Sequence, residues 1–311
     1  MNQVPILIKR EFWEHRNTFL VLPAVITVFF SLLLAGLFIF TENDGISAHI
    51  VIDGDNSSEE WSMDADDESM DEAMGIMFSK LPEMSVELRE QKLFQVFHSL
   101  TLPFFMVMSF VVFFYLIGSL YEDRKDRSIL FWKSMPVSNS KTVLIKLATA
   151  LLAVPAVYLV CAFVVQVFFL LVVSIAAMGH DINVFEMLVA PSNLIGRFFI
   201  DIAYLLVQGV WTLPFYGWVL LVSAFAKSVP LIWCIGVPFA VTLVEKLFFS
   251  EAHLSEWLFR HATPPHYSME SPLEISDLSH HLLRLDTLIG VVVGAGLILG
   301  AIWLRGRGDE I

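Results

Sequence analysis

Histidine and carboxylate side chains could hold a metal ion in this sequence, and each type gathers in one region. Five histidines lie in a single segment: His253, His261, His266, His280 and His281. Imidazole binds both zinc and copper. However, these spacings match no known metal signature, and two adjacent histidines diverge on a helix. A metal site and a polar cap at the membrane interface both remain open for this segment, and we favour the cap.

Acidic residues are dense between Glu59 and Glu72, in the run EEWSMDADDESMDE. Carboxylate oxygens bind calcium, but the ordered D-x-[DN]-x-[DN]-G pattern of a calcium loop is absent here. The wider segment 41–101 holds fifteen Asp and Glu against three basic residues, so it contributes −12 to the chain's net charge of −13. We interpret the segment as a solvated acidic loop, with calcium binding as the less favoured alternative.

The sequence contains no familiar catalytic or nucleotide-binding motif. H-E-x-x-H, G-x-S-x-G and Cys-x-x-Cys are all absent, and the two cysteines, Cys161 and Cys234, lie inside apolar runs where they suit packing. A G-x-x-x-x-G-K-[ST] phosphate loop is also absent. We therefore predict that the chain is not an enzyme and binds no cofactor itself. If ATP drives it, the ATP and Mg²⁺ belong to another polypeptide.

The composition is that of a membrane protein. Hydrophobic residues make up 56% of the chain and charged residues 16%, whereas a soluble domain has about 45–50% and about 25%. We predict one all-α integral membrane domain over residues 1–311, with an N-terminal interfacial helix in residues 1–18 and an acidic extracytoplasmic insertion at 41–101. Uncharged runs of about 20 residues can cross a bilayer as helices. The six predicted spans are about 19–40, 102–120, 143–178, 198–225, 229–249 and 287–304.

The basic residues predict how the chain is oriented. With the N-terminus inside, twelve of the nineteen Lys and Arg fall in short cytoplasmic segments, and seven are spread over longer outer ones. The positive-inside rule therefore places both termini in the cytoplasm and the acidic loop outside. We expect a multi-pass protein of the bacterial inner (cytoplasmic) membrane.

Residues 121–146, YEDRKDRSILFWKSMPVSNSKTVLIK, form the one long basic segment between two apolar runs. Residues 122–132 favour a short amphipathic coupling helix, which Pro136 would stop, and Ser138 or Ser140 could cap the helix that follows. The charges could merely orient the protein, but the apolar end and the mixed acids favour a lever for a docked partner. The candidate ATPase-coupling residues are Glu122, Asp123, Arg124, Lys125, Asp126, Arg127, Ile129, Leu130, Lys133 and Pro136.

Ionisable side chains are nearly absent from the middle of the predicted spans, where Gln166 and Gln208 are the polar groups. Ion pumps and proton-coupled carriers usually need such charges at mid-depth. The apolar interior therefore favours an amphipathic or lipid-like cargo, or the absence of a defined aqueous path in the resting state. The last span carries two G-x-x-x-G patterns, which let a neighbouring backbone approach closely. Intrachain packing is favoured over a second subunit. The candidate packing residues are Gly290, Gly294, Gly296 and Gly300.

The basic segment resembles the cytoplasmic loop of the type-2 permease family of ATP-binding-cassette (ABC) transporters, which follows E-x-x-x-G-[ST]-hydrophobic and then P-[VI]-[ST]. Glu122, the Ser128-Ile129-Leu130 step and Pro136-Val137-Ser138 carry the resemblance, and Lys146 opens the third span as a basic residue does in that family. Residues 8–17 resemble its amphipathic N-terminal helix. The segment between the fifth and sixth spans resembles its outward-facing re-entrant helices. Arg127 departs from the pattern, since the family commonly has Gly there, and the acidic loop is longer than in the simplest members.

The resemblance implies the membrane subunit of an ABC exporter of a lipid-like, peptide or drug-like substrate. A second permease copy or a related permease would pair with it, and two ATPase subunits would complete the complex. Residues 121–140 would dock in a groove of the ATPase, and membrane lipids would surround the permease. No nucleic-acid partner is expected. The main alternative is a non-transport membrane protein whose acidic outer loop recruits an extracytoplasmic partner. An intramembrane enzyme comes third, because catalytic residues are missing.

Overall fold

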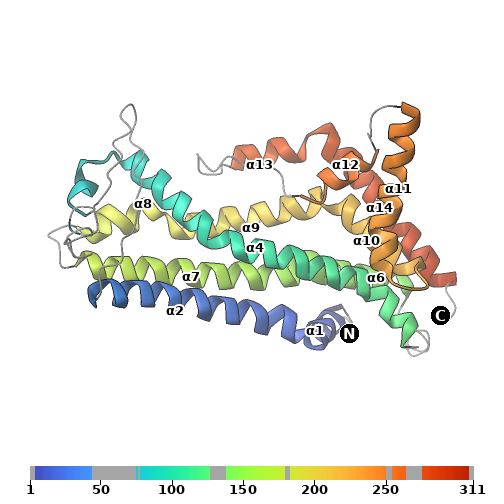
Figure 1. Ribbon diagram of the computed structural model, residues 1–311, viewed down its shortest axis with the longest axis horizontal. Helices are drawn as coiled ribbons and strands as arrows, with labels where there is room; N and C mark the ends of the chain where they lie inside the picture. The colour runs from blue at the N-terminus through green and yellow to red at the C-terminus, as the bar shows by residue number, and fades with distance from the viewer. Residues whose placement is uncertain are drawn as a thin grey trace.

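The computed structural model describes residues 4–43, 75, 78–126, 138–178, 183–249, 254–263 and 275–307, and within them every regular element is helical (Figure 1). The all-α prediction is therefore confirmed for this part of the chain. The α-helices are α1 Val4–Glu14, α2 Leu22–Asn43, α4 Val86–Lys125, α6 Asn139–Ala148, α7 Val154–Ala177, α8 Ala190–Ser192, α9 Leu194–Trp211, α10 Leu213–Phe225, α11 Pro230–Phe249, α12 Leu254–Arg260, α13 Ile275–Leu282 and α14 Leu285–Arg307. π-Helical turns join several of them, at Asn17–Val21, Thr149–Ala153 and Phe185–Val189, and a 3₁₀ turn covers Leu81–Glu83.

Six continuous helical stretches are long and apolar enough to cross a membrane, so the chain is a multi-pass membrane protein. They are Asn17–Leu37, Val86–Lys125, Asn139–Ala177, Phe185–Trp211, Pro230–Phe248 and Leu285–Arg307. The second and third contain 40 and 39 residues, which is roughly 60 Å of helix at 1.5 Å per residue. Because a hydrocarbon core is only about 30 Å thick, both stretches extend well past a membrane.

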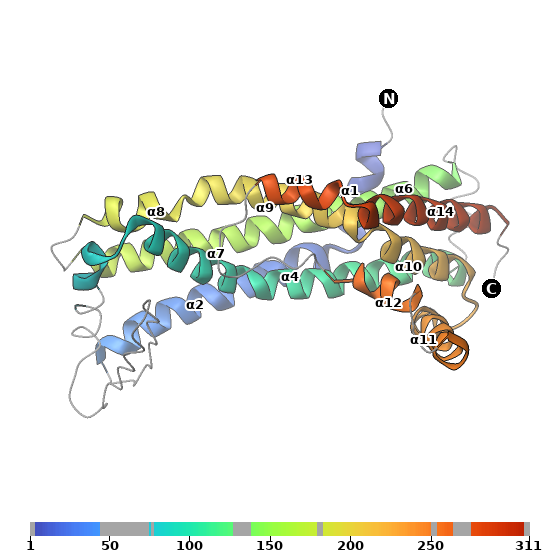
Figure 2. The ribbon, with the colours of Figure 1, turned by 90° about the horizontal axis from the view of Figure 1, so that it is seen from above.

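The long helices α2, α4, α7 and α9 run side by side along the longest axis of the molecule (Figures 1 and 2). The helix α1, the helix α6 and the last turns of α14 lie together at one end, which we call the basal end. The opposite end, where α8 lies, is called the distal end. A buried aromatic and aliphatic core fills the space between the long helices, with Phe104, Leu116, Tyr158 and Leu220 at its centre.

The predicted second and third spans are longer than their apolar runs. Helix α4 begins at Val86, where the Ser85 hydroxyl accepts a hydrogen bond from the amide of Leu88 (3.2 Å). It therefore continues through the polar residues on both sides of 102–120. The third stretch begins at Asn139 with Ser138 as the predicted N-cap, whose hydroxyl accepts from the amide of Lys141 (3.3 Å). A π-helical turn before Pro155 accommodates the proline, which has no N–H to donate.

The predicted fourth span, 198–225, is two helices rather than one. Helix α9 ends at Trp211 and α10 begins at Leu213, with Pro214 in its first turn. Proline at this place suits a helix start because the first N–H groups of a helix have no intrahelical acceptor. Thr212 occupies the junction and donates its hydroxyl hydrogen to the carbonyl of Gln208 (2.8 Å). The apolar stretch instead begins at Phe185, before α8.

Helix α11, the predicted fifth span, takes a different direction from the other long helices. It stands across the long axis of the bundle in Figure 1, and the view of Figure 2 looks nearly along it. Many of its apolar side chains are exposed, among them Ile232, Phe239 and Leu247. Cys234 and Pro238 are its buried residues among those described, and the carbonyl of Cys234 accepts a hydrogen bond from the Trp218 indole of α10 (3.1 Å).

The glycines of α14 allow α10 to pack directly against its backbone. A methyl group on Gly294 would lie 2.8 Å from the carbonyl carbon of Leu213 and 2.9 Å from the nitrogen of Pro214. Gly217 of α10 faces the same place, since a methyl group there would lie 2.9 Å from the carbonyl oxygen of Gly294. Gly290 and Gly300 also face neighbours within this chain, Pro214 and Leu221 respectively. Gly296 faces open space.

We predict that Gly294→Ala destabilises the bundle, because the new methyl group meets backbone atoms that cannot rotate away. Overpacking of this kind costs about 1–3 kcal/mol. Gly296→Ala is the matched control on the same helix, and it should be neutral or stabilising because alanine favours a helix over glycine by about 0.5–1 kcal/mol. Thermal unfolding of both variants in detergent checks the prediction, and equal unfolding temperatures would contradict it.

Candidate functional site

The last turn of α4 carries five of the candidate coupling residues, and the fold separates them into two sets. Glu122, Lys125 and Asp126 are exposed to solvent, whereas Asp123 and Arg124 are buried. Helix α4 ends at Lys125, so the start of the predicted coupling helix is the end of this long helix. The other candidates lie outside the described residues: Arg127, Ile129, Leu130, Lys133 and Pro136.

Arg124 joins α4 to the end of α10. Its Nη2 donates hydrogen bonds to the carbonyl oxygens of Ser223 (3.0 Å) and Ala226 (2.7 Å). The last carbonyl groups of a helix lack intrahelical partners, so a guanidinium placed there satisfies them and complements the helix dipole. The Ser223 hydroxyl in turn accepts from the amides of Leu120 (3.0 Å) and Tyr121 (3.1 Å). Arg124 is thus a structural residue, with little surface left for a docked protein.

Asp123 lies at the centre of a buried ionic network, which we define as Glu11, Asp123, Lys146 and Arg305. Arg305 Nη1 lies 2.8 Å from Asp123 Oδ2, and Lys146 Nζ lies 3.6 Å from Asp123 Oδ1. Lys146 also pairs with Glu11, at 3.1 Å from Oε1. The hydroxyl of Tyr115 donates to Glu11 Oε2 (2.9 Å). None of the four charged residues is more than 9% exposed.

The network connects four separate helices, because its members come from α1, α4, α6 and α14 in that order. It holds two acids and two bases, so it is neutral as a set. Removing one member of a buried ion pair leaves an uncompensated charge, which typically costs about 3–5 kcal/mol. These four helix ends are therefore expected to move together or to separate only at a large energetic cost.

Three members of the network, Glu11, Lys146 and Arg305, were not among the candidate coupling residues from the sequence, which noted Lys146 only as the basic residue that opens the third span. The sequence holds one indication for Glu11, because it lies four residues after Leu7 and so shares a helix face with it. The structure buries both residues of this face. Leu7 packs with Ile145 of α6, which brings α1 against the start of the third apolar stretch. Arg305 directly follows the last apolar run, where a basic residue ordinarily marks only the membrane border.

The histidines that the sequence offered as metal ligands lie apart from this network. His261 is fully buried, with its ring stacked on Trp211 (centroids 4.2 Å apart) and against Trp257 (4.3 Å). His280 is exposed, and His253 and His266 lie outside the described residues. Within the described ranges, no three His, Cys, Asp or Glu side chains gather closely enough to hold a metal ion.

The polar groups at mid-depth also differ in their roles. Gln166 of α7 donates from Nε2 to the Thr101 hydroxyl of α4 (2.7 Å), so its side chain joins these two helices. Gln208 of α9 is buried beside the junction at Thr212. The basal network, in contrast, consists of paired charges at the ends of four helices.

We predict that Lys146→Met strongly destabilises the fold, because Glu11 and Asp123 then share one positive charge, that of Arg305. The expected loss is about 3–5 kcal/mol. The double variant Glu11→Gln with Lys146→Met leaves a neutral Asp123–Arg305 pair and should recover much of this loss. Lys141→Met, on the exposed face of the same helix α6, should change stability by less than about 0.5 kcal/mol.

The measurement is thermal or denaturant unfolding in one detergent of the wild type, Lys146→Met, Lys141→Met and the double variant. The single variant Glu11→Gln is measured as well, because the additivity test needs it. A Lys146→Met variant as stable as Lys141→Met would show that the network contributes nothing. Additive losses in the double variant would show that Glu11 and Lys146 do not interact.

Comparison with known proteins adds no relative to this description. No family model matches the chain, no curated protein matches it, and no solved structure matches it. What the chain does is therefore inferred from its own residues and their arrangement.

Proposed function

We propose that this chain is the transmembrane permease subunit of an ABC transporter in the bacterial inner membrane, powered by a separate ATPase subunit. In this proposal it exports a lipid-like, peptide or drug-like substrate. One observation carries the proposal: a single turn of α4 presents Glu122, Lys125 and Asp126 to solvent while Asp123 and Arg124 fasten it to other helices. The chain then continues into residues 127–137 of the basic segment, which lie outside the described residues.

The buried side of this turn gives the mechanism. A partner that moves the segment after Lys125 would move the end of α4. Asp123 would pass that motion to α14 through its 2.8 Å charge-assisted hydrogen bond with Arg305. It would pass it to α6 through the longer ion pair with Lys146, at 3.6 Å. Arg124 would pass it to α10 through two carbonyl groups. The turn is therefore suited to convert a push on one loop into movement of several membrane helices.

The orientation in the proposal places the basal end in the cytoplasm. This end presents exposed basic residues on separate elements, including Lys9 on α1, Lys141 on α6 and Lys227 after α10, which suits the cytoplasmic face. Helix α1 exposes Trp13 (55%) beside its charged residues, as expected of a helix in the headgroup region. The acidic segment 41–101 would then be extracytoplasmic.

A second permease copy, or a related permease, completes the proposed transporter. Six apolar stretches with much of their surface exposed need either lipid or other helices around them. Helix α11 offers one such surface, with Ile232, Phe239 and Leu247 exposed. Lipid covers whatever part of it a second permease does not.

The docking role predicts that Lys125→Glu with Arg127→Glu weakens association with the ATPase and its ATP hydrolysis without unfolding the permease. Arg124 is left unchanged because it caps α10. Lys246→Glu, an exposed charge reversal on α11, is the control and should leave both properties intact. The complex is purified from native membranes in mild detergent, and its ATPase activity and subunit composition are measured.

Wild-type association and activity in the Lys125→Glu, Arg127→Glu variant would count against docking at this loop. If the wild-type chain purified in mild detergent carries no nucleotide-hydrolysing subunit, the transport proposal fails. A soluble extracytoplasmic protein retained in its place would favour the alternative in which the acidic loop recruits a partner.

The proposed orientation gives a separate prediction for a chain in which Cys161 and Cys234 are replaced by alanine. A new cysteine at Lys133 should react with a membrane-impermeant maleimide only after the inner membrane is opened. A new cysteine at Ser57, in the acidic segment, should react before it is opened. Labelling of Lys133→Cys in intact spheroplasts would show that the orientation is the opposite of the proposed one. It would also contradict docking of a cytoplasmic ATPase on this loop.

A further inference from the structure

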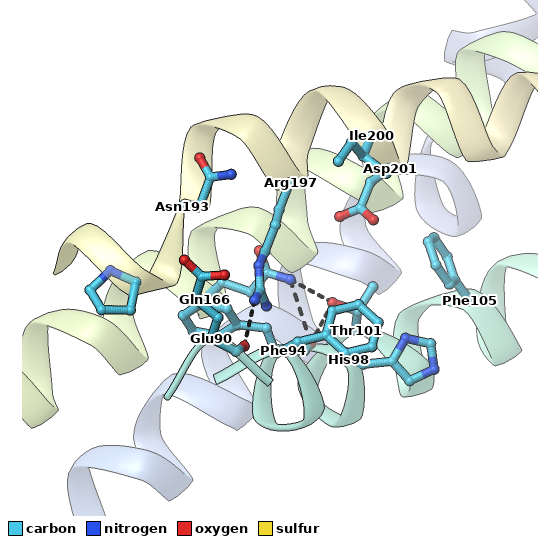
Figure 3. Close-up of a pocket in the computed structure, with 12 residues that line it drawn as sticks. Glu90, Phe94, His98, Thr101, Phe105, Gln166, Asn193, Arg197, Ile200 and Asp201 are labelled. Atoms are coloured by element: carbon cyan, nitrogen blue, oxygen red, sulfur yellow. Dashed lines mark hydrogen bonds between the residues drawn. The ribbon is translucent and has the colours of Figure 1, made fainter. Parts of the chain in front are cut away.

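A cavity of about 110 Å³ lies in the distal half of the molecule, between α4, α7 and the α8–α9 junction. Figure 3 shows Arg197 and Asp201 pointing from α9 toward α4, with His98 and Phe105 on the facing helix. Glu90 and Asn193 are exposed at its edge, and Gln166 is buried on the α7 side. The cavity is separate from the basal network, and the proposed coupling mechanism does not use it.

The one positive charge in the lining is already engaged. Arg197 Nη2 donates to the carbonyl oxygen of Glu90 (3.0 Å). Its guanidinium carbon lies over the rings of Phe94 (5.2 Å) and Phe97 (5.4 Å) in cation–π geometry. Arg197 Nη1 has no hydrogen-bond partner among the described residues, but protein atoms cover it completely. The Nη1 end of the guanidinium is therefore closed to an anionic ligand unless the side chains that cover it move.

Asp201 is in the opposite situation. It lies one helical turn after Arg197 and lines the cavity, and its carboxylate makes no hydrogen bond or ion pair with the described residues. Arg197 acts on the Asp201 carboxylate only through its electric charge, without a direct ion pair. Phe105 and His98 face it from α4 (Figure 3). A partly buried carboxylate without a hydrogen-bond partner is costly, and a cation that enters the cavity would relieve this cost.

The size of the cavity limits what can enter. Its volume is about 110 Å³. A drug-sized ligand needs a pocket of about 300–1,000 Å³. The space therefore fits one small charged group, with the remainder of the molecule outside. An ammonium group matches both the size and the charge, because aromatic faces and a carboxylate together favour cations.

We propose that this cavity binds the ammonium group of an amphipathic amine, with Asp201 as its counter-ion and Phe105 as its aromatic wall. The amine enters past the polar edge at Glu90 and Asn193, and its apolar chains lie along the exposed surface of the neighbouring helices. The Gln166 Nε2 donates a hydrogen bond to the Thr101 hydroxyl, so this N–H group is already engaged within the protein. The assignment concerns binding to the isolated chain and holds with or without transport.

The test measures binding to the purified full chain in detergent by native mass spectrometry, with three probes. Short-chain phosphatidylethanolamine carries the ammonium group on a lipid, short-chain phosphatidylglycerol lacks it, and ethanolamine carries it without a lipid. We expect phosphatidylethanolamine to bind at least tenfold more tightly than phosphatidylglycerol. Asp201→Asn should abolish this preference, and Asp201→Glu should retain it.

Glu87→Gln is the matched control, because it removes one exposed negative charge from the same end of α4 without touching the cavity. It should bind all three probes as the wild type does. Phe105→Leu provides a second readout that keeps every charge, and it should weaken phosphatidylethanolamine binding several-fold. Circular dichroism and thermal unfolding confirm that each variant is folded.

Equal binding of the two lipids to the wild type would overturn the proposal. A preference that survives in Asp201→Asn would also overturn it. Ethanolamine binding as tightly as the lipid, and lost in Asp201→Asn, would keep the ammonium site but assign it to soluble amines. Weak ethanolamine binding would assign it to the lipid headgroup.

Discussion

The pairing of charge inside an apolar bundle is the constraint on which the basal half of this molecule depends. Glu11, Asp123, Lys146 and Arg305 are all nearly inaccessible, and an isolated ion at such a place would be prohibitively costly. Each charge is therefore compensated by one from another helix. The pairs cross long stretches of chain, because Glu11 and Lys146 are 135 residues apart and Asp123 and Arg305 are 182 apart. This requirement fixes the positions of α1, α4, α6 and α14 relative to one another.

Near this network, two helices pack closely because glycine takes the place of a larger residue at their contact. At the α10–α14 contact, Gly217 and Gly294 bring two backbones together. In a membrane the lipid tails are as apolar as the protein, so van der Waals contact between close helices replaces the hydrophobic effect as a source of stability. The break at Thr212 serves the same contact, because α10 takes its own direction after α9 ends and lies against α14.

Helix α4 joins the two sites of interest. It carries Glu90 and Phe105 beside the distal cavity and Asp123 in the basal network, roughly 50 Å from Glu90 to Asp123 as a continuous helix. Helix α4 contains Pro103 between these two regions, and α7 and α9 run beside it (Figure 1). The distal cavity and the basal network therefore share one helix, although they involve different side chains of it.

Local composition and residues a few positions apart were enough to predict the helical class, the number of apolar stretches and a serine N-cap at Ser138 or Ser140, of which the structure uses Ser138. The sequence also located the turn after Tyr121 as unusual, although it treated all five charges from Glu122 to Asp126 alike. The folded structure was needed to find that Asp123 and Arg124 are buried while Glu122, Lys125 and Asp126 are exposed. The same holds for the choice of Glu11 and Arg305 as partners and for the position of Asp201 opposite Phe105. Which charge meets which depends on how each helix is rotated and how far it is shifted along its neighbours, and those quantities are set by packing across the whole bundle.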